Sequence, residues 1–97
     1  MELILWRHAE AAPGDPDAAR SLTAHGHRQA EAMARFLLPR LPMDLRVIAS
    51  PARRTQETAR ALGRAAETIE ALAPGCDVAT LLAAAGWPDS PRPLLVI

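Results

Sequence analysis

The sequence predicts an α/β fold in which a mostly parallel sheet lies between two layers of helices. Short apolar runs recur at residues 3–6, 47–49 and 94–97. Segments with the apolar period of a helix alternate with these runs, and stretches rich in Gly and Pro separate the two kinds of segment. Strands that alternate with helices favour a parallel, three-layer α/β/α sheet, in which ligands bind beyond the carboxyl ends of the strands.

The first part of the chain predicts a buried strand, a loop and a long helix. Leu3 to Trp6 form a continuous apolar run, as expected of a strand buried on both faces, and Arg7-His8 follows it. Ala11 to Ser21 is too rich in Pro, Gly and Asp to be anything but a loop. Thr23 is expected to cap a helix that ends near Pro39. The apolar face of that helix comprises Ala30, Met33, Ala34, Leu37, Leu38 and Leu41.

The middle of the chain predicts a second strand and a second helix. Val47 to Ala49 is the strand, and Ser50-Pro51 is expected to start the helix, with the Ser50 hydroxyl as N-cap and proline at the first helical position. The helix should run to about Ala65. A weaker strand is expected over Thr68 to Leu72. Three side chains should face the sheet, namely Thr58, Ala59 and Leu62, and four should face water, namely Gln56, Glu57, Arg60 and Arg64.

The last part predicts a short helix followed by a third strong strand. Asp77 is expected to cap the helix and Gly86 to end it. Leu94 to Ile97 then has the apolar pattern of a buried strand. Because a domain rarely ends inside its own central strand, we expect residues 1–97 to be the N-terminal portion of a single domain, truncated at its C-terminus.

Composition narrows the classes of function. Eleven arginines, with no lysine, balance eleven Asp and Glu, so the formal net charge is zero. This balance removes the broad cationic field of a general nucleic-acid binder, so any phosphate recognition has to be local. Cys76 is the only cysteine, which excludes an internal disulfide and favours the cytoplasm. The apolar run at the N-terminus is too short for a signal peptide or a membrane span.

Two arginines and a histidine are the candidate groups for chemistry. A neutral imidazole at His8 can attack phosphorus while Arg7 draws charge from the non-bridging oxygens, although a histidine at a strand end is more often structural. Arg54 lies in the first turn of the second helix, where unpaired backbone N–H groups favour an anion. Arg53 is the obvious rival, and periodicity alone favours the alternative that both arginines are solvated residues at a helix end.

A histidine pair in the first helix is the one other candidate site. His25 and His27 are two residues apart, and that spacing points the two rings apart on a helix. No Cys or carboxylate cluster accompanies them. We therefore expect exposed surface residues and no metal site.

Three ordered motifs resemble a known family. Residues 5–11, Leu-Trp-Arg-His-Ala-Glu-Ala, resemble the Arg-His-Gly signature of the histidine phosphatase superfamily in its Arg-His-x-Glu-Ala form. Residues 22–30, Leu-Thr-x-x-Gly-x-x-Gln-Ala, resemble the family's next block. Residues 50–59 match the pattern Ser-Pro-x-x-Arg-x-x-x-Thr-Ala, which assigns the second phosphate-binding arginine to Arg54. The resemblance implies a phosphoglycerate mutase-like fold.

Within that superfamily, the chain most resembles the short bacterial phosphohistidine phosphatases. The compact connection after the second helix and the stretch from Leu72 to Val78 carry this resemblance. Larger members acting on phosphosugars carry a Glu as general acid in this region, but neither Glu67 nor Glu70 has a matching context, and Ala71 falls where related short members have Glu. A departing imidazole, with a conjugate-acid pKa of roughly 6.5, leaves without strong acid help. The sequence thus favours phosphohistidine as substrate.

The resemblance implies a metal-independent, cofactor-free phosphatase with a covalent phosphohistidine intermediate. His8 is then the nucleophile, and Arg7 and Arg54 hold the equatorial oxygens, with Ser50 as a further substrate-binding residue. Ala9 replaces the family's commoner Gly. Family members place a second His about two residues after a strand resembling Leu94 to Ile97, and the sequence ends before that position. Either the natural protein continues, or this is a defective domain.

The resemblance also implies a partner. A short phosphohistidine phosphatase would act on a phosphorylated protein, such as a His-containing phosphotransfer domain in signal transduction. Two alternatives remain: a phosphomonoesterase for a small phosphorylated metabolite, and a non-catalytic module that binds phosphate or a phosphoprotein. Neither nucleic acid nor a membrane is expected as a partner.

Overall fold

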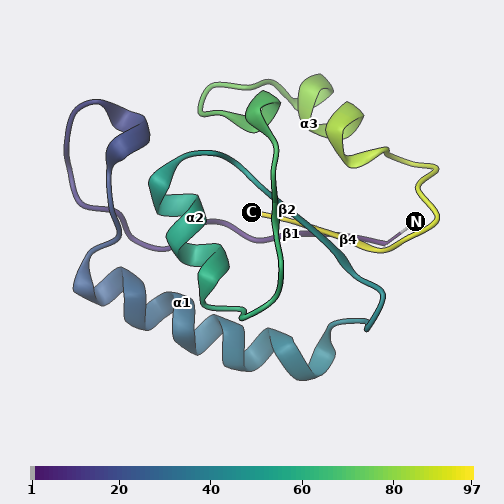
Figure 1. The fold of residues 1–97 in the computed structure, drawn as a ribbon, viewed down its shortest axis with the longest axis horizontal. Helices are drawn as coiled ribbons and strands as arrows, with labels where there is room; N and C mark the ends of the chain where they lie inside the picture. The colour runs from purple at the N-terminus through teal and green to yellow at the C-terminus, as the bar shows by residue number, and fades with distance from the viewer. Residues whose placement is uncertain (1) are drawn as a thin grey trace.

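Four parallel strands form one sheet in the computed structural model, which describes residues 2–97 (Figure 1). The strands are β1 (Leu3–Leu5), β2 (Arg46–Ala49), β3 (Glu67–Thr68) and β4 (Leu94–Val96), in the order β1-β4-β2-β3. The last strand in sequence therefore lies between the first and the second. Since all pairings are parallel, the carboxyl ends of the strands meet at one edge. The predicted parallel α/β fold is confirmed.

Helices cover both faces of this sheet. The α-helices are α1 (Ala24–Leu37), α2 (Arg53–Arg60) and α3 (Val78–Ala85), and short 3-10 helices are η1 (Asp17–Ala19), η2 (Leu38–Arg40) and η3 (Glu70–Leu72). In Figure 1, α1 and α2 lie on one side of the strands and α3 with η3 on the other. This is the expected three-layer arrangement. None of the helices in residues 2–97 has the length and apolar character that crossing a membrane requires.

Alternating side chains of the two central strands build two separate cores. Val47 and Leu95 pack with Ala34 and Leu62 beneath α1 and α2. On the opposite face, a second cluster lies beneath α3 and η3 and comprises Ile48, Leu72, Ala85, Leu94 and Val96. Successive strand residues point to opposite faces, so a central strand such as β4 is apolar throughout. This explains why residues 94–97 have a continuous apolar pattern.

Three of the four predicted helix caps, Thr23, Asp77 and Gly86, are confirmed. The Thr23 hydroxyl accepts a hydrogen bond from the Gly26 backbone N–H at 2.9 Å at the start of α1. The Asp77 carboxylate accepts one from the Thr80 N–H at 2.8 Å at the start of α3. Gly86 ends α3 in the left-handed conformation, with φ of 69°, which glycine adopts without strain.

The expected boundaries of α2 and of the strand after it were wrong. α2 begins at Arg53 with Ala52 as its N-cap, because the Ser50 hydroxyl instead accepts from the Ala52 N–H at 3.2 Å and closes a turn before the helix. It ends at Arg60, five residues before Ala65, and Gly63 follows with φ of 66°. The third strand is Glu67–Thr68, and residues 70–72 coil into η3, which buries Leu72.

The apolar face predicted for the first helix, which spans α1 and η2 in the structure, is buried over a narrower stripe than expected. Met33 and Leu38 are 42% and 37% exposed, whereas Ala30 and Ala34 are 2% exposed. The small alanines let the helix approach the layer beneath it closely, so larger residues at the border of the stripe stay outside. Met33 instead lines a recess between α1 and the segment that follows β1.

Candidate active site

The segment that follows β1 is hydrogen-bonded to α2 through the buried side chain of Thr58. The Ala9 N–H donates to Thr58 Oγ1 at 3.1 Å, and the same hydroxyl donates to the Arg54 carbonyl at 2.8 Å. Thr58 is fully buried. A hydroxyl can donate one bond and accept others, so this side chain satisfies both groups at once. It therefore holds His8 opposite the first turn of α2.

The hydrogen bonds of His8 define its tautomer. Nδ1 lies 2.8 Å from the Ala9 carbonyl oxygen, which can only accept, so Nδ1 carries the proton. Nε2 lies 3.3 Å from Nε of Arg54, which can only donate, so Nε2 is the acceptor. The ring is therefore the neutral Nδ1–H form. Nε2 then carries the lone pair that a nucleophile needs, and the neighbouring Arg54 guanidinium can attract an anion to it.

Arg54 is held by the loop between β1 and α1. Its Nη1 donates to the Asp17 carbonyl at 2.9 Å and its Nη2 to Asp17 Oδ2 at 3.1 Å. Hydrogen bonds from Arg20 and Arg54 hold the pKa of the Asp17 carboxyl below its usual value. Sequence reasoning missed Asp17, because an acidic residue in a breaker-rich loop has no spacing rule that links it to a helix 37 residues away.

Four predicted site residues line one hollow at the carboxyl edge of the sheet. Arg7, His8, Ser50 and Arg54 surround about 250 Å³ of space beneath residues 72–76. Within residues 2–97, Arg7 forms no ion pair, so its exposed guanidinium is open to an anionic ligand. The hollow thus combines an imidazole lone pair with two guanidinium groups.

The rival arginine lies outside this hollow. The Arg53 side chain is 61% exposed and its Nε lies 3.7 Å from Oε1 of Glu57, one turn along α2. Glu57, expected to face water, is largely buried and accepts from the Leu22 N–H at 2.8 Å. Neighbouring residues thus point to different surroundings. Only Arg54 reaches His8.

The motif over residues 22–30 packs the start of α1 against the segment that follows His8. A Cβ at Gly26 would lie 2.1 Å from the Glu10 carbonyl oxygen, so glycine is required there. The same carbonyl accepts from the Thr23 N–H at 3.0 Å, and the Gln29 side chain accepts from the Glu10 N–H at 3.0 Å. These contacts pack the segment after His8 against the start of α1. The residues that carry the resemblance therefore contact one another.

The remaining candidates lie away from the hollow. His25 and His27 are exposed, at 4.0 Å from Glu10 and 3.7 Å from Glu57 respectively, as expected of surface residues. In the part of the chain that the structure describes, no three His, Cys, Asp or Glu side chains are grouped as a metal site requires. Glu67 pairs with Arg46, and Glu70 lies in η3, so neither lines the hollow.

The comparison with known proteins agrees with this geometry. A family model described as histidine phosphatase superfamily (branch 1) matches residues 3–79. The chain belongs to the histidine phosphatase superfamily. No match was found among curated protein sequences.

Solved structures similar to this chain carry the name SixA. A protein from Nakamurella multipartitia assigned as phosphohistidine phosphatase SixA is 32% identical, with a TM-score of 0.80, over 97% of this chain and 55% of that chain. Another so assigned, from Agrobacterium tumefaciens, is 26% identical, with a TM-score of 0.82, over 98% of this chain and 66% of that chain. The protein histidine phosphatase SixA complexed with tungstate is 28% identical, with a TM-score of 0.75, over 99% and 68%. The chain thus spans from about half to two thirds of these relatives.

Proposed function

We propose that this chain carries the phosphoryl-accepting part of a phosphatase active site, with His8 as the nucleophile. The single observation that supports it most is the position of His8, whose Nδ1 lies 2.8 Å from the Ala9 carbonyl oxygen and whose Nε2 lies 3.3 Å from Nε of Arg54. A phosphoryl group attached to that nitrogen would lie against the guanidinium. The tungstate bound by one similar protein is also a tetrahedral oxyanion.

The proposed reaction has two steps. His8 Nε2 attacks phosphorus and forms an N–P bond as the bond to the leaving group breaks, and the leaving group takes the bonding pair. Arg7 and Arg54 stabilise the charge on the equatorial oxygens. The Nδ1–H bond to the Ala9 carbonyl stabilises the ring as it becomes more positive. Water then breaks the N–P bond, releasing phosphate and restoring neutral His8.

We further propose phosphohistidine on a protein, such as a phosphotransfer domain, as the substrate. Among residues 2–97, no carboxylate side chain lines the hollow. Glu10, which follows the motif histidine, is engaged by the Thr23 hydroxyl at 3.2 Å. A phosphoramidate needs less acid help than a phosphate ester, because a departing imidazole is a far weaker base than an alkoxide. The names of the similar SixA proteins support this proposal.

The test is to trap the intermediate in the natural polypeptide that contains residues 1–97. After brief incubation with phosphoramidate, the peptide that includes His8 should gain the mass of one acid-labile phosphoryl group. His8→Asn should abolish both the mass gain and turnover, while His27→Asn, on the exposed face of α1, should leave both unchanged. Turnover retained by His8→Asn would contradict the mechanism.

The same assay separates the remaining functions. A higher kcat/KM for phenyl phosphate than for phosphoramidate would indicate a phosphomonoesterase for small metabolites. Binding of orthovanadate without any turnover by the natural polypeptide would indicate a phosphate-binding module. A phosphoramidate preference together with the trapped intermediate would support the proposal.

A further inference from the structure

The proposed chemistry leaves one polar contact of the site unused, that between Asp17 and Arg54. Asp17 comes from η1, in the loop after β1, and contacts Arg54 through both its backbone carbonyl and its carboxylate. The Arg54 side chain is only 11% exposed, whereas Asp17 is 56% exposed. The loop therefore reaches over the arginine from the solvent side.

Asp17 binds one particular edge of the guanidinium. The planar group has an end edge, formed by Nη1 and Nη2, and a side edge, formed by Nε and Nη2. Both contacts from Asp17 fall on the end edge, at 2.9 and 3.1 Å. Asp17 makes no contact through Nε of the side edge, and the Nε–H instead donates to His8 Nε2 at 3.3 Å. Through Nε and Nη2, the side edge can donate hydrogen bonds to two oxygens of a phosphoryl group on His8.

Asp17 is itself held in place independently of Arg54. Its Oδ1 accepts from Nη1 of Arg20 at 3.1 Å, and Nε of Arg20 donates to the Ala12 carbonyl at 2.8 Å. The Asp17 carboxylate is thus hydrogen-bonded within its own loop as well as to Arg54 of α2. An arginine side chain loses considerable rotamer freedom when it is ordered, and a preformed acceptor reduces that loss during phosphoryl binding.

We propose that Asp17 is a positioning residue, which holds the end edge of Arg54 so that the side edge faces the phosphoryl group on His8. This inference rests on the proposed function and adds the residue that orients its second arginine. Two arginines share the one carboxylate, and Arg7 lies nearby. The site therefore remains positive for an anion.

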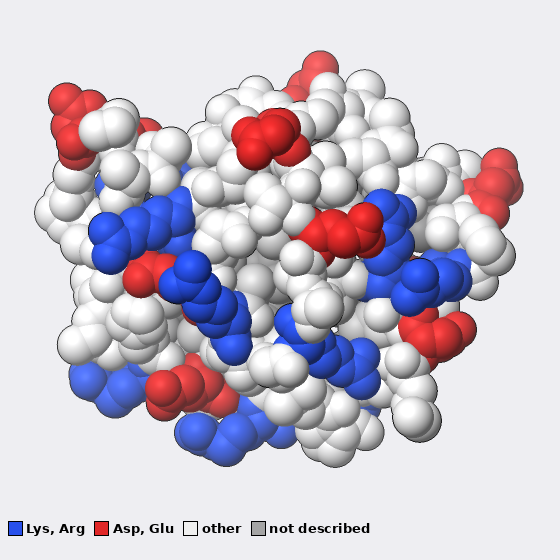
Figure 2. All heavy atoms as spheres, in the orientation of Figure 1, with Lys and Arg blue, Asp and Glu red and all other residues white. Residues whose placement is uncertain are grey.

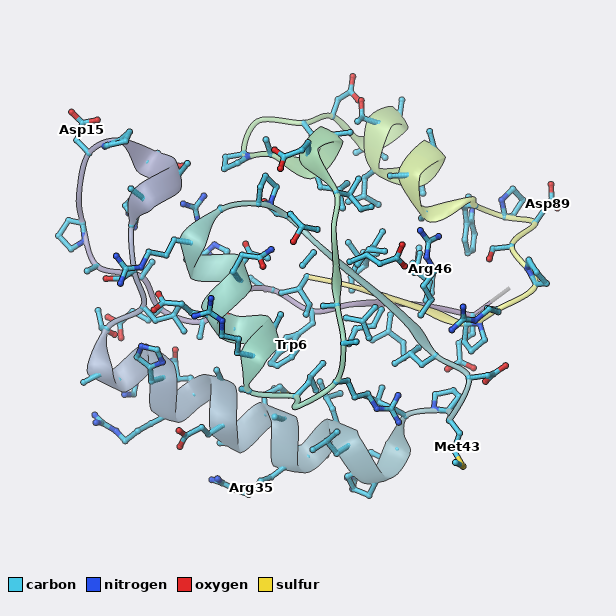
Figure 3. The ribbon with its side chains drawn as sticks, viewed as in Figure 1. Trp6, Asp15, Arg35, Met43, Arg46 and Asp89 are labelled. Atoms are coloured by element: carbon cyan, nitrogen blue, oxygen red, sulfur yellow. The ribbon has the colours of Figure 1, made fainter. Side chains whose placement is uncertain are left out.

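Asp15 offers a matched control for the test. It lies two residues earlier in the same loop, it is exposed, and it points away from the rest of the molecule in Figure 3. Asp15→Ala and Asp17→Ala remove the same charge from the same segment. In the natural polypeptide, Asp17→Ala should lower kcat for phosphoramidate by about tenfold, the loss of one hydrogen bond to a charged group. Asp15→Ala should leave kcat unchanged.

A merely structural role would not couple to Arg54. In an Arg54→Lys background, where the ammonium has no separate edges, Asp17→Ala should cause no further loss of orthovanadate affinity, measured by calorimetry. When the wild-type Arg54 is present, Asp17→Ala should weaken vanadate binding about tenfold. Equal losses in both backgrounds would overturn the proposal.

The outcomes distinguish this inference from the function on which it rests. If the wild type turns over phosphoramidate and Asp17→Ala has the same kcat as Asp15→Ala, the inference is overturned but the proposed phosphatase activity is not. Tighter vanadate binding by Asp17→Ala would also overturn it, because Asp17 would then compete with the anion for Arg54. Absence of wild-type turnover would refute the phosphatase, and the vanadate cycle would still decide the role of Asp17.

Discussion

Two arginine–carboxylate pairs lie at the two ends of β2, and they differ in the edge of the guanidinium that the carboxylate occupies. At the start of the strand, Arg46 binds Glu67 through Nε at 2.6 Å and Nη2 at 3.2 Å, which is the side edge. After the end of the strand, Arg54 binds Asp17 through the end edge. In the first pair, Glu67 occupies the side edge of Arg46, so that edge cannot bind a ligand. In the second pair, the side edge of Arg54 faces His8. A contact with a carboxylate can therefore either occupy an arginine or orient it.

The surroundings of the two pairs agree with this difference. The pair at the start of β2 is self-contained, since Glu67 raises the pKa of Arg46 and Arg46 in turn lowers that of Glu67. Figure 3 shows Arg46 on the side of the molecule away from the loop that carries Asp15. Figure 2 shows basic side chains beside acidic ones on this face, with no continuous basic surface. Charge is thus mostly paired locally.

The largest expected effect comes from removing each arginine in turn. Arg54→Ala should lower kcat for phosphoramidate by about 100- to 1000-fold, as loss of an oxyanion-binding donor does, whereas Arg46→Ala should change it by less than about twofold. Steady-state kinetics on the natural polypeptide measures both. Arg53→Ala provides the matched control within α2 and should resemble Arg46→Ala. A larger loss for Arg53→Ala than for Arg54→Ala would show that the wrong arginine has been assigned.

A second expected effect concerns the backbone that supports His8. Gly26→Ala should lower the free energy of unfolding by about 3 kcal/mol, the upper end for overpacked positions, because its Cβ would lie 2.1 Å from the Glu10 carbonyl oxygen. Gly14→Ala is the control, since its Cβ would meet only the Arg20 side chain at 3.5 Å. Urea unfolding measures the difference, and equal midpoints would mean that the close approach is absent.

The same isosteric swap can be made beside each of the two pairs. Thr58→Val leaves the Ala9 N–H without its acceptor in a buried place, so we expect a loss of about 2 kcal/mol in the free energy of unfolding. Thr68→Val, beside Glu67, removes only an exposed hydroxyl contact to Gln56 and should have little effect. Thermal unfolding of both variants tests this, and a similar loss for each would refute the special role of Thr58.

The weakest effect that we predict is the change with pH of the stability that the Arg46–Glu67 pair contributes. Arg46 lowers the pKa of Glu67 from its ordinary 4.5, so folding favours the ionised carboxylate. Its contribution to stability is present above pH 4.5 and is lost as the pH falls through the lowered value. Wild type should therefore unfold at a slightly higher temperature than Glu67→Gln near neutral pH, and this difference should shrink in acid. A difference that grows in acid would have the wrong sign.

Much of the candidate site could be predicted from motif residues, because their spacing maps onto the ends of parallel strands. His8 and Arg54 both line one hollow, as expected of residues that follow neighbouring parallel strands, while the choice of Arg54 over Arg53 came from the family resemblance and their catalytic roles stay a prediction. The role of Ser50 as a helix cap was wrong, because a turn closed by its hydroxyl competes with capping and local spacing cannot rank the two. Asp17 could not be predicted at all, since its position depends on the path of an irregular loop.

Sequence patterns alone predict the succession of strands and helices along the chain, the two capped helix starts at Thr23 and Asp77, and the end of α3 at Gly86. These features arise from contacts within a few residues, whose geometry is set by the local backbone. The hydrogen bonds of His8 and the guanidinium edge that each carboxylate binds become apparent only in the folded chain. Both depend on atoms brought together across tens of residues, where a rotation of one planar group changes its partner without changing any sequence pattern.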